Sequence, residues 1–358
     1  MTFCRLARQR DFLSLNSHFV LIMHRSISLI IPTDKVDTPF QQCLESIGKC
    51  APPPLEIIIV VDGDTGQVLP HVEGIDLKTI RLPVCGGPGR ARNAGVAEAS
   101  GDILLFVDAD VLLPEDICLS VGRAFSVTPS PDAVFGSYDD KPPAQNTVSQ
   151  YKNLLHHYTH QHSRSEAFTF WTGCGAILRR RFIELKGFNE EYLKPSIEDI
   201  ELGYRLKQAG GTILLDKTIK VTHLKTWSLF SMLHTDFFLR AIPWSRLIYQ
   251  YGTMHNDMNI NRKSRLSVVL CCLTLLCFSF ILVNALFLPA AFLFFLSFLA
   301  VNRDIFLFFY KKKGLFFFLK TIPLHFLYSF LSSLAFCVVS FQYLVKKMAG
   351  TVKKGIFA

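Results

Sequence analysis

Acidic residues are almost absent from the last third of this 358-residue chain. Between Arg240 and Ala358 there are 14 lysines and arginines but only two acids, Asp257 and Asp304, so this stretch has a formal charge of +12. The first 239 residues contain 24 basic and 27 acidic side chains, a charge of −3. Because the basic excess lies in the most apolar part of the chain, the net charge of +9 does not indicate a nucleic-acid-binding surface. We therefore expect no nucleic-acid partner.

Charged residues of either sign are missing from Leu266–Asn302, and this run is longer than the ~20 residues that cross a bilayer core. It is interpreted as two helices with a turn near Asn284 and Pro289, or as one long tilted helix. A second apolar run, Leu315–Val345, predicts at least one further span. The mean hydropathy of +0.29 agrees with these runs and argues against a purely soluble enzyme. The high apolar content also excludes intrinsic disorder.

Three basic clusters flank the apolar runs, and they are Arg262–Arg265, Lys311–Lys313 and Lys346–Lys347. The positive-inside rule places all three on the cytoplasmic side. A hairpin over the first apolar run satisfies the first two clusters, but a single span after it would put the third cluster outside. The sequence therefore predicts a multi-pass protein of a bacterial-type inner or plasma membrane, with two to four spans.

Several motifs that bind metals or phosphates are also missing. The ten cysteines show no CxxC spacing, which favours reduced, buried thiols in a cytosolic domain. Neither GxGxxG nor GK[ST] occurs, which excludes a dinucleotide fingerprint and a P-loop. The short apolar run Phe19–Met23 lacks a small-residue cleavage site, so a signal peptide is rejected. Residues 1–25 are either an over-extended start or an amphipathic surface segment.

Apolar strands alternate with helices in the first part of the chain. The expected strands are Ser26–Pro32, Leu55–Val61, Thr79–Leu82 and Ile103–Val107, and the expected helices are 38–50, capped by Thr38, and 90–99. This alternation predicts an α/β fold with a mostly parallel, doubly wound, Rossmann-like sheet. Ligands of such sheets bind beyond the carboxyl ends of the strands.

The next part of the chain has a more mixed pattern. We expect a strand at Ala133–Gly136, a helix at Val148–His162 and a strand–turn–strand at Phe168–Leu178. Two helices at 179–185 and 197–209 and two late strands at Ile213–Leu215 and Ile219–Thr222 follow.

Four carboxylates come at the ends of two expected strands, and they are Asp62, Asp64, Asp108 and Asp110. Residues i and i+2 of an extended segment point the same way, so Asp108 and Asp110 share one face. Paired carboxylates can hold a divalent cation through hard oxygen ligands. Such a cation would neutralise a diphosphate and help it leave.

Two further sets of residues suit an anionic sugar donor. Arg92 and Asn93 lie at the start of a helix after a glycine loop, where a phosphate can bind, although capping and a solvated face are the alternative. Gly173 and Gly175 would let the backbone approach a sugar, and Trp171 would stack on it or pack in the core.

Glu198 and Asp199 come at the start of the expected helix 197–209, where a carboxylate can act as a general base. His223 follows a late strand and could be a third metal ligand, or an ordinary structural histidine. His156 and His160 share one helical face, but no HExxH spacing accompanies them. We therefore expect an acceptor-side or surface helix there rather than a zinc site.

Taken together, these motifs resemble the family 2 glycosyltransferases of GT-A fold. The matching segments are SLIIPT at 28–33, IIIVVDGD at 57–64, GRARNAG at 89–95, GDILLFVDAD at 101–110, TGCGAILRR at 172–180, GFNEEY at 187–192 and IEDIELGYRL at 197–206. The resemblance covers about residues 26–240. It implies inverting transfer of a sugar from a nucleotide-diphosphate sugar, with Mg²⁺ or Mn²⁺ as cofactor.

The resemblance also implies roles for single residues. Pro32, Thr33 and Asp62 would bind the donor, with Asp62 at the nucleobase. Asp108 would lie at the ribose or metal, Asp110 would be a metal ligand, and His223 is similar to the late metal-binding histidine of several GT-A enzymes. Asp199 would be the catalytic base, with Glu198 beside it.

The chain departs from the family pattern in two places. The segment VVDGDTG replaces the commoner VDDGSTD, so the nucleobase contact differs. The QxxRW motif of processive polysaccharide synthases is absent, which favours transfer of a single sugar. The alternatives are a nucleotidyltransferase, which the segment Thr33–Lys35 suits poorly, and a degenerate membrane assembly protein, against which the intact Asp108, Asp110 and Asp199 argue.

The predicted organisation has five parts. They are an N-terminal segment at 1–25, a GT-A domain at 26–240, a juxtamembrane linker at 241–265, transmembrane helices within 266–345 and a basic tail at 346–358. Nucleotide sugars are cytosolic, so the catalytic domain should face the cytoplasm. The anchor suggests a membrane-associated acceptor, either lipid-linked or a cell-envelope glycan.

Overall fold

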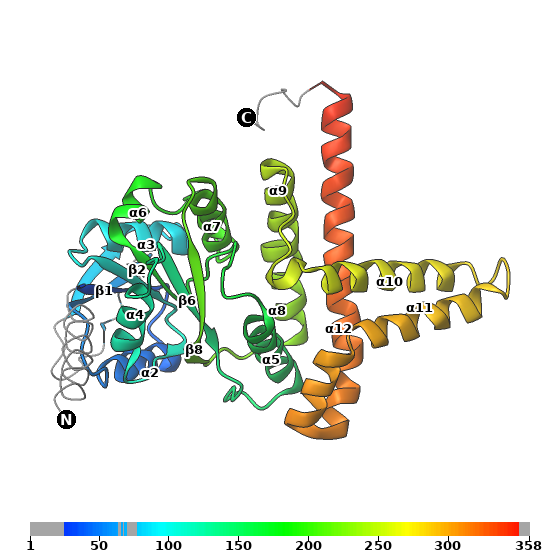
Figure 1. Cartoon of the computed structure of the whole chain (residues 1–358), viewed down its shortest axis with the longest axis horizontal. Helices are drawn as coiled ribbons and strands as arrows, with labels where there is room; N and C mark the ends of the chain where they lie inside the picture. The colour runs from blue at the N-terminus through cyan, green and yellow to red at the C-terminus, as the bar shows by residue number, and fades with distance from the viewer. Residues whose placement is uncertain (1–24, 64–65, 67, 70–76, 351–358) are drawn as a thin grey trace, which may run out of the picture. The chain divides into compact units, whose positions relative to one another are not determined.

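The computed structural model describes residues 25–63, 66, 68–69 and 77–350, and the chain forms two compact units (Figure 1). Unit 1 consists of the described part of Met1–Ser137 with Ser165–Leu193 and Glu198–Leu224. Unit 2 consists of Tyr138–Arg164, Lys194–Ile197 and the described part of Lys225–Ala358. The predictions for residues 1–24, Asp64 and the end of the basic tail lie outside the described residues. The five-part division stays a prediction.

Unit 1 is built around a sheet of eight strands in the order β3-β2-β1-β4-β7-β6-β8-β5. The strands are β1 Ile27–Thr33, β2 Glu56–Asp62, β3 Leu77–Leu82, β4 Ile103–Val107, β5 Val111–Leu112, β6 Ala133–Tyr138, β7 Cys174–Leu178 and β8 Ile213–His223. The helices of this unit are α2 Thr38–Ile47, α3 Pro88–Ala97, α4 Ile117–Phe125, α6 Arg179–Glu184 and α7 Glu198–Gln208. The α/β fold is therefore as predicted.

The strands β3, β2, β1 and β4 pair in parallel, and this half of the sheet matches the predicted arrangement. All five side chains of β4 are buried, which explains the continuous apolar run in the sequence. Helix α3 packs closely on β1 at Gly95, where an added Cβ would lie 2.6 Å from Ile30 Cγ2. The pairs β4–β7, β6–β7 and β5–β8 are antiparallel.

Three local predictions were wrong. The side chain that caps α2 belongs to Asp37, which accepts from the Phe40 N–H at 3.2 Å, and Thr38 is already inside the helix. Only the second of the two strands expected in 168–178 forms, as β7. The two late strands are one continuous strand, β8, in which the Thr218 N–H donates to the Asp216 carboxylate at 2.9 Å.

Unit 2 is helical. Its elements are α5 Thr147–His162, α8 Leu229–His234, the π-helix η1 Thr235–Ala241, α9 Ile242–Tyr251, the 3₁₀-helix η2 Met258–Ile260, α10 Arg262–Ser279, α11 Phe287–Val301 and α12 Arg303–Met348. Helices α10 and α11 form the expected hairpin, and Asn284 lies in the turn between them. The backbone of α12 leaves the helical conformation at Gly314, where φ is +80°.

The expected number of membrane spans is not supported. Among the described residues, only α12 is both long and apolar enough to cross a membrane, and α11 is a shorter apolar helix. On α5, His160 is buried and His156 half-buried, which does not favour the surface alternative, and the acceptor-side alternative stays a prediction. The nine cysteines that the structure describes are all free thiols, and six of them are buried.

Candidate active site

The carboxyl ends of the strands in unit 1 bring the predicted acidic residues to one edge of the sheet. Asp62 is the last residue of β2, and Asp108 and Asp110 follow β4. Strand β5 pairs with the end of β8, with Val111 opposite His223. This pairing places the Nε2 atom of His223 3.5 Å from the Oδ2 atom of Asp110.

Asp62 organises the glycine loop that precedes α3. Its carboxylate accepts hydrogen bonds from the N–H groups of Gly86, at 2.9 Å, and Gly87, at 2.8 Å. The thiol of Cys85 donates to the same carboxylate at 3.3 Å. Gly87 has a φ of +89°, and an added Cβ would lie 2.5 Å from the Tyr192 carbonyl, so the loop needs glycine there. The expected role of Asp62 at the nucleobase stays a prediction.

Arg92 is a buried residue of α3 that forms ion pairs with two carboxylates of the site. Its guanidinium pairs with Asp108 Oδ1 at 2.7 Å and with Glu198 Oε1 at 2.8 Å, and it stacks over the Phe188 ring at 5.6 Å. The residue is only 3% exposed. A buried side chain paired with two carboxylates is suited to position them, and the expected contact of Arg92 with the donor phosphates stays a prediction.

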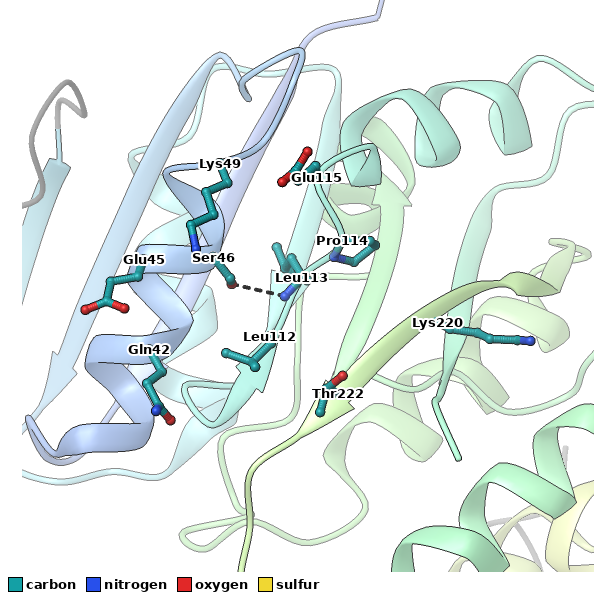
Figure 2. A pocket seen from close by; sticks show the side chains of 10 residues that line it. All are labelled: Gln42, Glu45, Ser46, Lys49, Leu112, Leu113, Pro114, Glu115, Lys220 and Thr222. Carbon is teal, nitrogen blue, oxygen red and sulfur yellow. Dashed lines mark hydrogen bonds between the residues drawn. The ribbon is translucent and has the colours of Figure 1, made fainter. Parts of the chain in front are cut away.

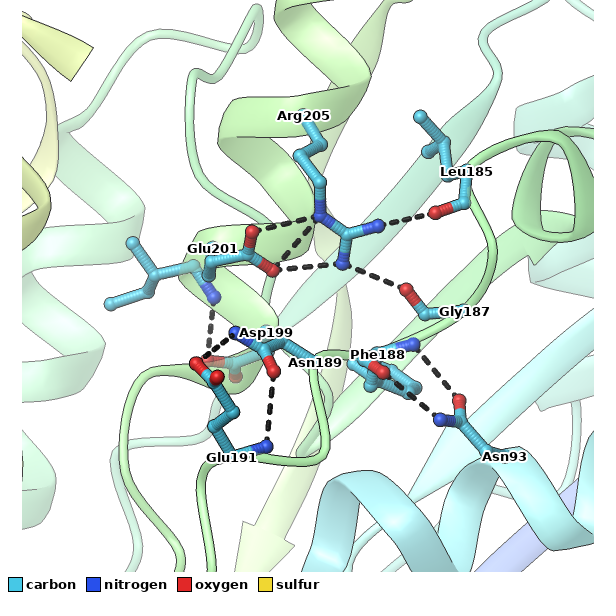
Figure 3. A network of polar contacts seen from close by, with 10 residues as sticks. Asn93, Leu185, Gly187, Phe188, Asn189, Glu191, Asp199, Glu201 and Arg205 are labelled. Atoms are coloured by element: carbon cyan, nitrogen blue, oxygen red, sulfur yellow. Dashed lines mark hydrogen bonds and ion pairs between the residues drawn. The ribbon is translucent and has the colours of Figure 1, made fainter. Parts of the chain in front are cut away.

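Asn93 also faces the protein rather than a ligand. Its amide nitrogen donates to the Phe188 carbonyl at 2.9 Å, and its amide oxygen accepts from the Phe188 N–H at 2.9 Å (Figure 3). The amide nitrogen also donates to the Glu190 carboxylate at 2.9 Å. Direct donor binding by Asn93 is therefore not what this geometry favours. The side chain instead fixes the loop between α6 and α7.

A second anchor holds the same loop from α7. Arg205 forms a two-pronged ion pair with Glu201, one turn earlier on the helix, with the shortest contact at 2.8 Å. Its remaining N–H groups donate to the carbonyls of Leu185 and Gly187 (Figure 3). Bidentate guanidinium–carboxylate pairs have a fixed geometry. This pair therefore ties the start of the loop to the helix that carries Asp199.

Asp199 lies in the first turn of α7 and is held by three donors. Its Oδ2 atom accepts from the Thr172 N–H at 3.1 Å and from the Thr172 hydroxyl at 3.3 Å. Its Oδ1 atom accepts from the Ile200 N–H at 2.8 Å (Figure 3). Asp199 is half-buried as a residue, and approach of an acceptor hydroxyl to its carboxylate stays a prediction.

The surroundings of Asp199 disfavour its charged form. Burial, followed by the negative charge of Glu198, raises the pKa of Asp199 to about 7. The Arg92 guanidinium and the N–H donors of Thr172 and Ile200 act in the opposite direction and lower this pKa. A carboxylate whose pKa lies near neutrality is suited to take a proton and release it again.

The two glycines of the segment TGCG are explained by packing. An added Cβ on Gly173 would lie 2.2 Å from the Trp171 ring, and one on Gly175 would lie 2.1 Å from the Trp171 carbonyl. Gly175 also faces Phe106 across the β4–β7 pair. Approach of a sugar to these glycines stays a prediction, as does donor binding at the end of β1. At the end of β1, the Thr33 hydroxyl donates to the Lys35 carbonyl and accepts from the Lys35 N–H. The preceding residue, Pro32, is half-buried.

The predicted metal ligands form a partial set. The carboxylate of Asp110 and the imidazole of His223 present an oxygen and a nitrogen donor side by side, which suits a divalent cation whose other ligands come from a diphosphate and water. One oxygen of Asp108 is instead engaged by Arg92. Within the described part of the chain, no three His, Cys, Asp or Glu side chains gather closely enough to hold a metal by themselves.

A surface cavity of about 480 Å³ lies elsewhere on unit 1, between α2, β5 and the end of β8 (Figure 2). It is lined by Gln42, Glu45, Ser46, Lys49, Leu112, Leu113, Pro114, Glu115, Lys220 and Thr222. The Ser46 hydroxyl accepts from the Leu113 N–H there at 3.0 Å. None of the predicted site residues lines this cavity, so it does not define the donor site.

Sequence reasoning missed Thr172 and the pair of Glu201 and Arg205. The i,i+4 spacing of Glu201 and Arg205 on an expected helix was a usable signal for an ion pair. The contact of Thr172 with Asp199 joins residues 27 positions apart and had no local signal.

The pH dependence of catalysis follows from the position of Asp199. A general base must be ionised, and the pKa of Asp199 is raised to about 7, so its active form increases as the pH rises through that value. We expect kcat/KM for the donor, which reports the ionisation of the free protein, to rise between pH 6 and 8 with a midpoint near 7. A pH–rate profile measures this. A rate that is flat from pH 5 to 8 would contradict the assignment.

Comparison with known proteins agrees with these features. Residues 28–185 match the family described as glycosyl transferase family 2. The poly(ribitol-phosphate) beta-N-acetylglucosaminyltransferase TarS of Staphylococcus aureus (strain Mu50) is 36% identical over 90 residues, which cover 23% of this chain and 16% of that protein. The uncharacterized glycosyltransferase YwdF of Bacillus subtilis is 32% identical over 162 residues, 43% of this chain and 58% of that protein. The chain thus spans less than two thirds of the length of these relatives.

The fold has a counterpart among solved structures. The mannosyltransferase PcManGT from Pyrobaculum calidifontis, in complex with GDP-Man and Mn²⁺, aligns over 87% of this chain and 88% of its own, with a TM-score of 0.52 and 15% identity. At that identity the likeness concerns the fold alone. The family match and the curated relatives show that residues 28–185 are similar to family 2 glycosyltransferases.

Proposed function

We propose that this protein transfers a single sugar, with inversion, from a nucleotide-diphosphate sugar to a membrane-associated acceptor, either lipid-linked or a cell-envelope glycan. The observation that carries the proposal is the position of Asp199. Asp199 has a pKa raised to about 7, and the neighbouring Glu198 is joined to Asp108 through two ion pairs of Arg92. The relatives named as glycosyltransferases support the reaction class.

The proposed chemistry uses the residues of unit 1. Asp199 takes the proton of an acceptor hydroxyl, and the oxygen attacks the anomeric carbon on the face opposite the leaving group. The bond to the nucleoside diphosphate breaks, and its electron pair leaves with the diphosphate. Arg92 holds Glu198 and Asp108 in place during this step.

A divalent cation, Mg²⁺ or Mn²⁺, would be held by Asp110 and His223, and when bound it would neutralise the charge of the leaving diphosphate. The donor set described above fits such a cation, and the PcManGT structure contains Mn²⁺. Asp108 would contact the donor rather than complete the metal site, because Arg92 occupies one of its oxygens.

The proposed location is a bacterial-type inner or plasma membrane, with unit 1 on the cytoplasmic side where nucleotide sugars are found. Helix α12 supplies the apolar segment that supports membrane attachment. The finer arrangement of the helices on the membrane is taken up below.

The metal dependence of donor cleavage tests this function. Membranes containing the full chain would be incubated with UDP-, GDP- and TDP-sugars, and nucleoside diphosphate release would be measured with Mn²⁺, with Mg²⁺ or with EDTA. We expect release from at least one donor, abolished by EDTA and reduced at least about a hundredfold in Asp110→Ala, because the loss of one charged metal ligand removes several kcal/mol of stabilisation. Asp116→Ala, at an exposed site on α4, is the matched control.

One outcome would overturn the proposed sugar transfer, and another would overturn only its metal dependence. Failure of every donor to bind or turn over would favour a degenerate, non-enzymatic domain. Undiminished turnover in EDTA, with Asp110→Ala fully active, would remove the metal role while leaving sugar transfer in place.

A further inference from the structure

Helix α12 has its polar and apolar faces reversed relative to a helix of a water-soluble protein. Its buried face carries a polar residue at every fourth position, and this polar stripe consists of Thr321, His325, Ser329 and Ser333. Large apolar side chains are exposed away from this stripe, and they include Phe316 at 82% exposure and Phe341 at 68%. Polar residues that face inward while apolar residues face outward are typical of helices in contact with lipid.

Polar helices accompany α12 along most of its length. The Tyr151 hydroxyl of α5 is hydrogen bonded to His325 at 3.0 Å, and the Tyr249 hydroxyl of α9 donates to Ser340 at 2.8 Å. The buried ion pair between Lys152 and Asp236 lies next to it, with Lys152 5.6 Å from the Tyr328 ring. A helix that crossed the bilayer would carry these charged and polar partners into the hydrocarbon, where they are costly.

The hairpin formed by α10, α11 and the turn between them is called the apolar hairpin. Around the turn, its described residues form no ion pairs or hydrogen bonds with charged side chains, and most of them are exposed. The turn between the two helices exposes Leu282 completely, Val283 at 76% and Leu286 at 75%, and Phe292 on α11 is 62% exposed. No charged residue occurs from 266 to 302. In Figure 1 this apolar hairpin projects from α12 on the side away from α5, α8 and α9.

Basic residues surround the base of the apolar hairpin. Arg262, Lys263 and Arg265 begin α10, and Arg303 follows α11. At 1.5 Å per residue, the charge-free part of α10, residues 266–279, measures about 21 Å and the 15 residues of α11 about 22 Å, which is shorter than the ~30 Å hydrocarbon core. The apolar hairpin can therefore insert part of the way into the core while its two ends stay with the headgroups on one side.

We propose that unit 2 binds a lipid bilayer from one side only, with the apolar hairpin inserted and α12 lying along the membrane surface rather than crossing it. The apolar side chains of α12 then face the acyl chains, and its polar stripe faces α5 and α9. The basic clusters Lys311–Lys313 and Lys346–Lys347 come to the same side, which removes the conflict with the positive-inside rule. This inference rests on the proposed membrane attachment and is independent of sugar transfer.

The placement of α12 is tested by finding on which side of the membrane the C-terminus lies. One epitope would be inserted into the exposed segment 127–130 of unit 1, and a second after Ala358 of the full chain. In sealed inverted vesicles, a protease added outside should remove both epitopes. A protected C-terminal epitope beside a cleaved epitope at 127–130 would show that α12 crosses the bilayer and would overturn the placement.

Charges at the tip of the apolar hairpin test its insertion. We expect the double variant Leu282→Lys with Val283→Lys to lower the fraction bound to phosphatidylcholine–phosphatidylglycerol vesicles at least about tenfold. The control is Val68→Lys, which puts one lysine at an apolar position of unit 1 that is 87% exposed. Unchanged binding of the double variant would overturn insertion, as would a detergent-free soluble dimer that buries the hairpin.

A separate readout keeps this inference distinct from the proposed function. Donor binding by the detergent-solubilised protein does not depend on how unit 2 meets a membrane. Retained donor binding with a protected C-terminus would refute only the membrane arrangement. Loss of donor binding with both epitopes cleaved would refute only the transferase.

Discussion

Replacement of Asp199 by asparagine is expected to lower sugar transfer by about 10²–10⁴-fold, the range that a positioned general base contributes. The amide keeps the shape of the side chain, and its single oxygen can still accept from either Thr172 or Ile200, while the NH2 group replaces the other acceptor. The start of α7 should therefore remain folded with at least one hydrogen bond fewer. It cannot take a proton from the acceptor. Donor affinity should stay within about threefold of the unchanged protein, since Asp199 is assigned to the acceptor side.

Steady-state release of the nucleoside diphosphate measures the loss, and calorimetric titration with the donor measures binding. Asp116→Asn provides a matched change at an exposed carboxylate of α4. The variant Glu198→Gln distinguishes the role of Glu198 from that of Asp199. Glu198 accepts a hydrogen bond from the Arg92 guanidinium, so we do not expect it to act as the base. Full activity in Asp199→Asn, or a much larger loss in Glu198→Gln, would move the base assignment away from Asp199.

Replacement of Arg92 by glutamine is expected to destabilise unit 1 by about 3–5 kcal/mol, the usual effect of breaking a buried ion pair from one side. Most of this loss of stability comes from Glu198, because its side chain is only 5% exposed and would be left without the Arg92 guanidinium as its partner. Asp108 contributes less, since a third of its side chain reaches solvent. Urea denaturation of the detergent-solubilised protein measures the change as a lower midpoint.

The same variant should also change the pH dependence of transfer. Arg92 lowers the pKa of Asp199, so its removal raises that pKa, and the rising limb of the pH–rate profile should move to higher pH. A purely structural role for Arg92 would not move this midpoint.

Two control variants show whether the effects of Arg92→Gln come from the loss of this particular guanidinium. Arg92→Lys keeps the charge and should restore part of the pH midpoint, although it loses the two-pronged geometry. Arg123→Gln removes an exposed arginine of α4 and should leave both measurements unchanged. The proposed role would be wrong if Arg92→Gln unfolded at the urea concentration of the unchanged protein and kept its pH midpoint.

Much of the parallel half of the sheet was predictable because burial on both faces leaves a continuous apolar run in the sequence. β1, β2 and β4 carry such runs, and the carboxylates that end β2 and β4 marked the edge where the site lies. The turn of the apolar hairpin near Asn284 was predictable for a similar reason, since a polar residue interrupts a charge-free stretch. The segment 168–173 was not, because the Thr172 N–H bonds Asp199 rather than a neighbouring strand.

The chain by itself determined which residue types stand at the strand ends and where the apolar segments lie, because periodicity and charge are local properties. Only the tertiary structure decided how those residues act. Arg92 had the sequence signature of a phosphate ligand, but its contacts with Asp108 and Glu198 join positions 16 and 106 residues away. The sequence of α12 likewise suggested a span, and only the packing of α5 and α9 against it revealed that its polar stripe faces inward. Contacts between distant segments have no local signal, so composition and spacing could not predict them.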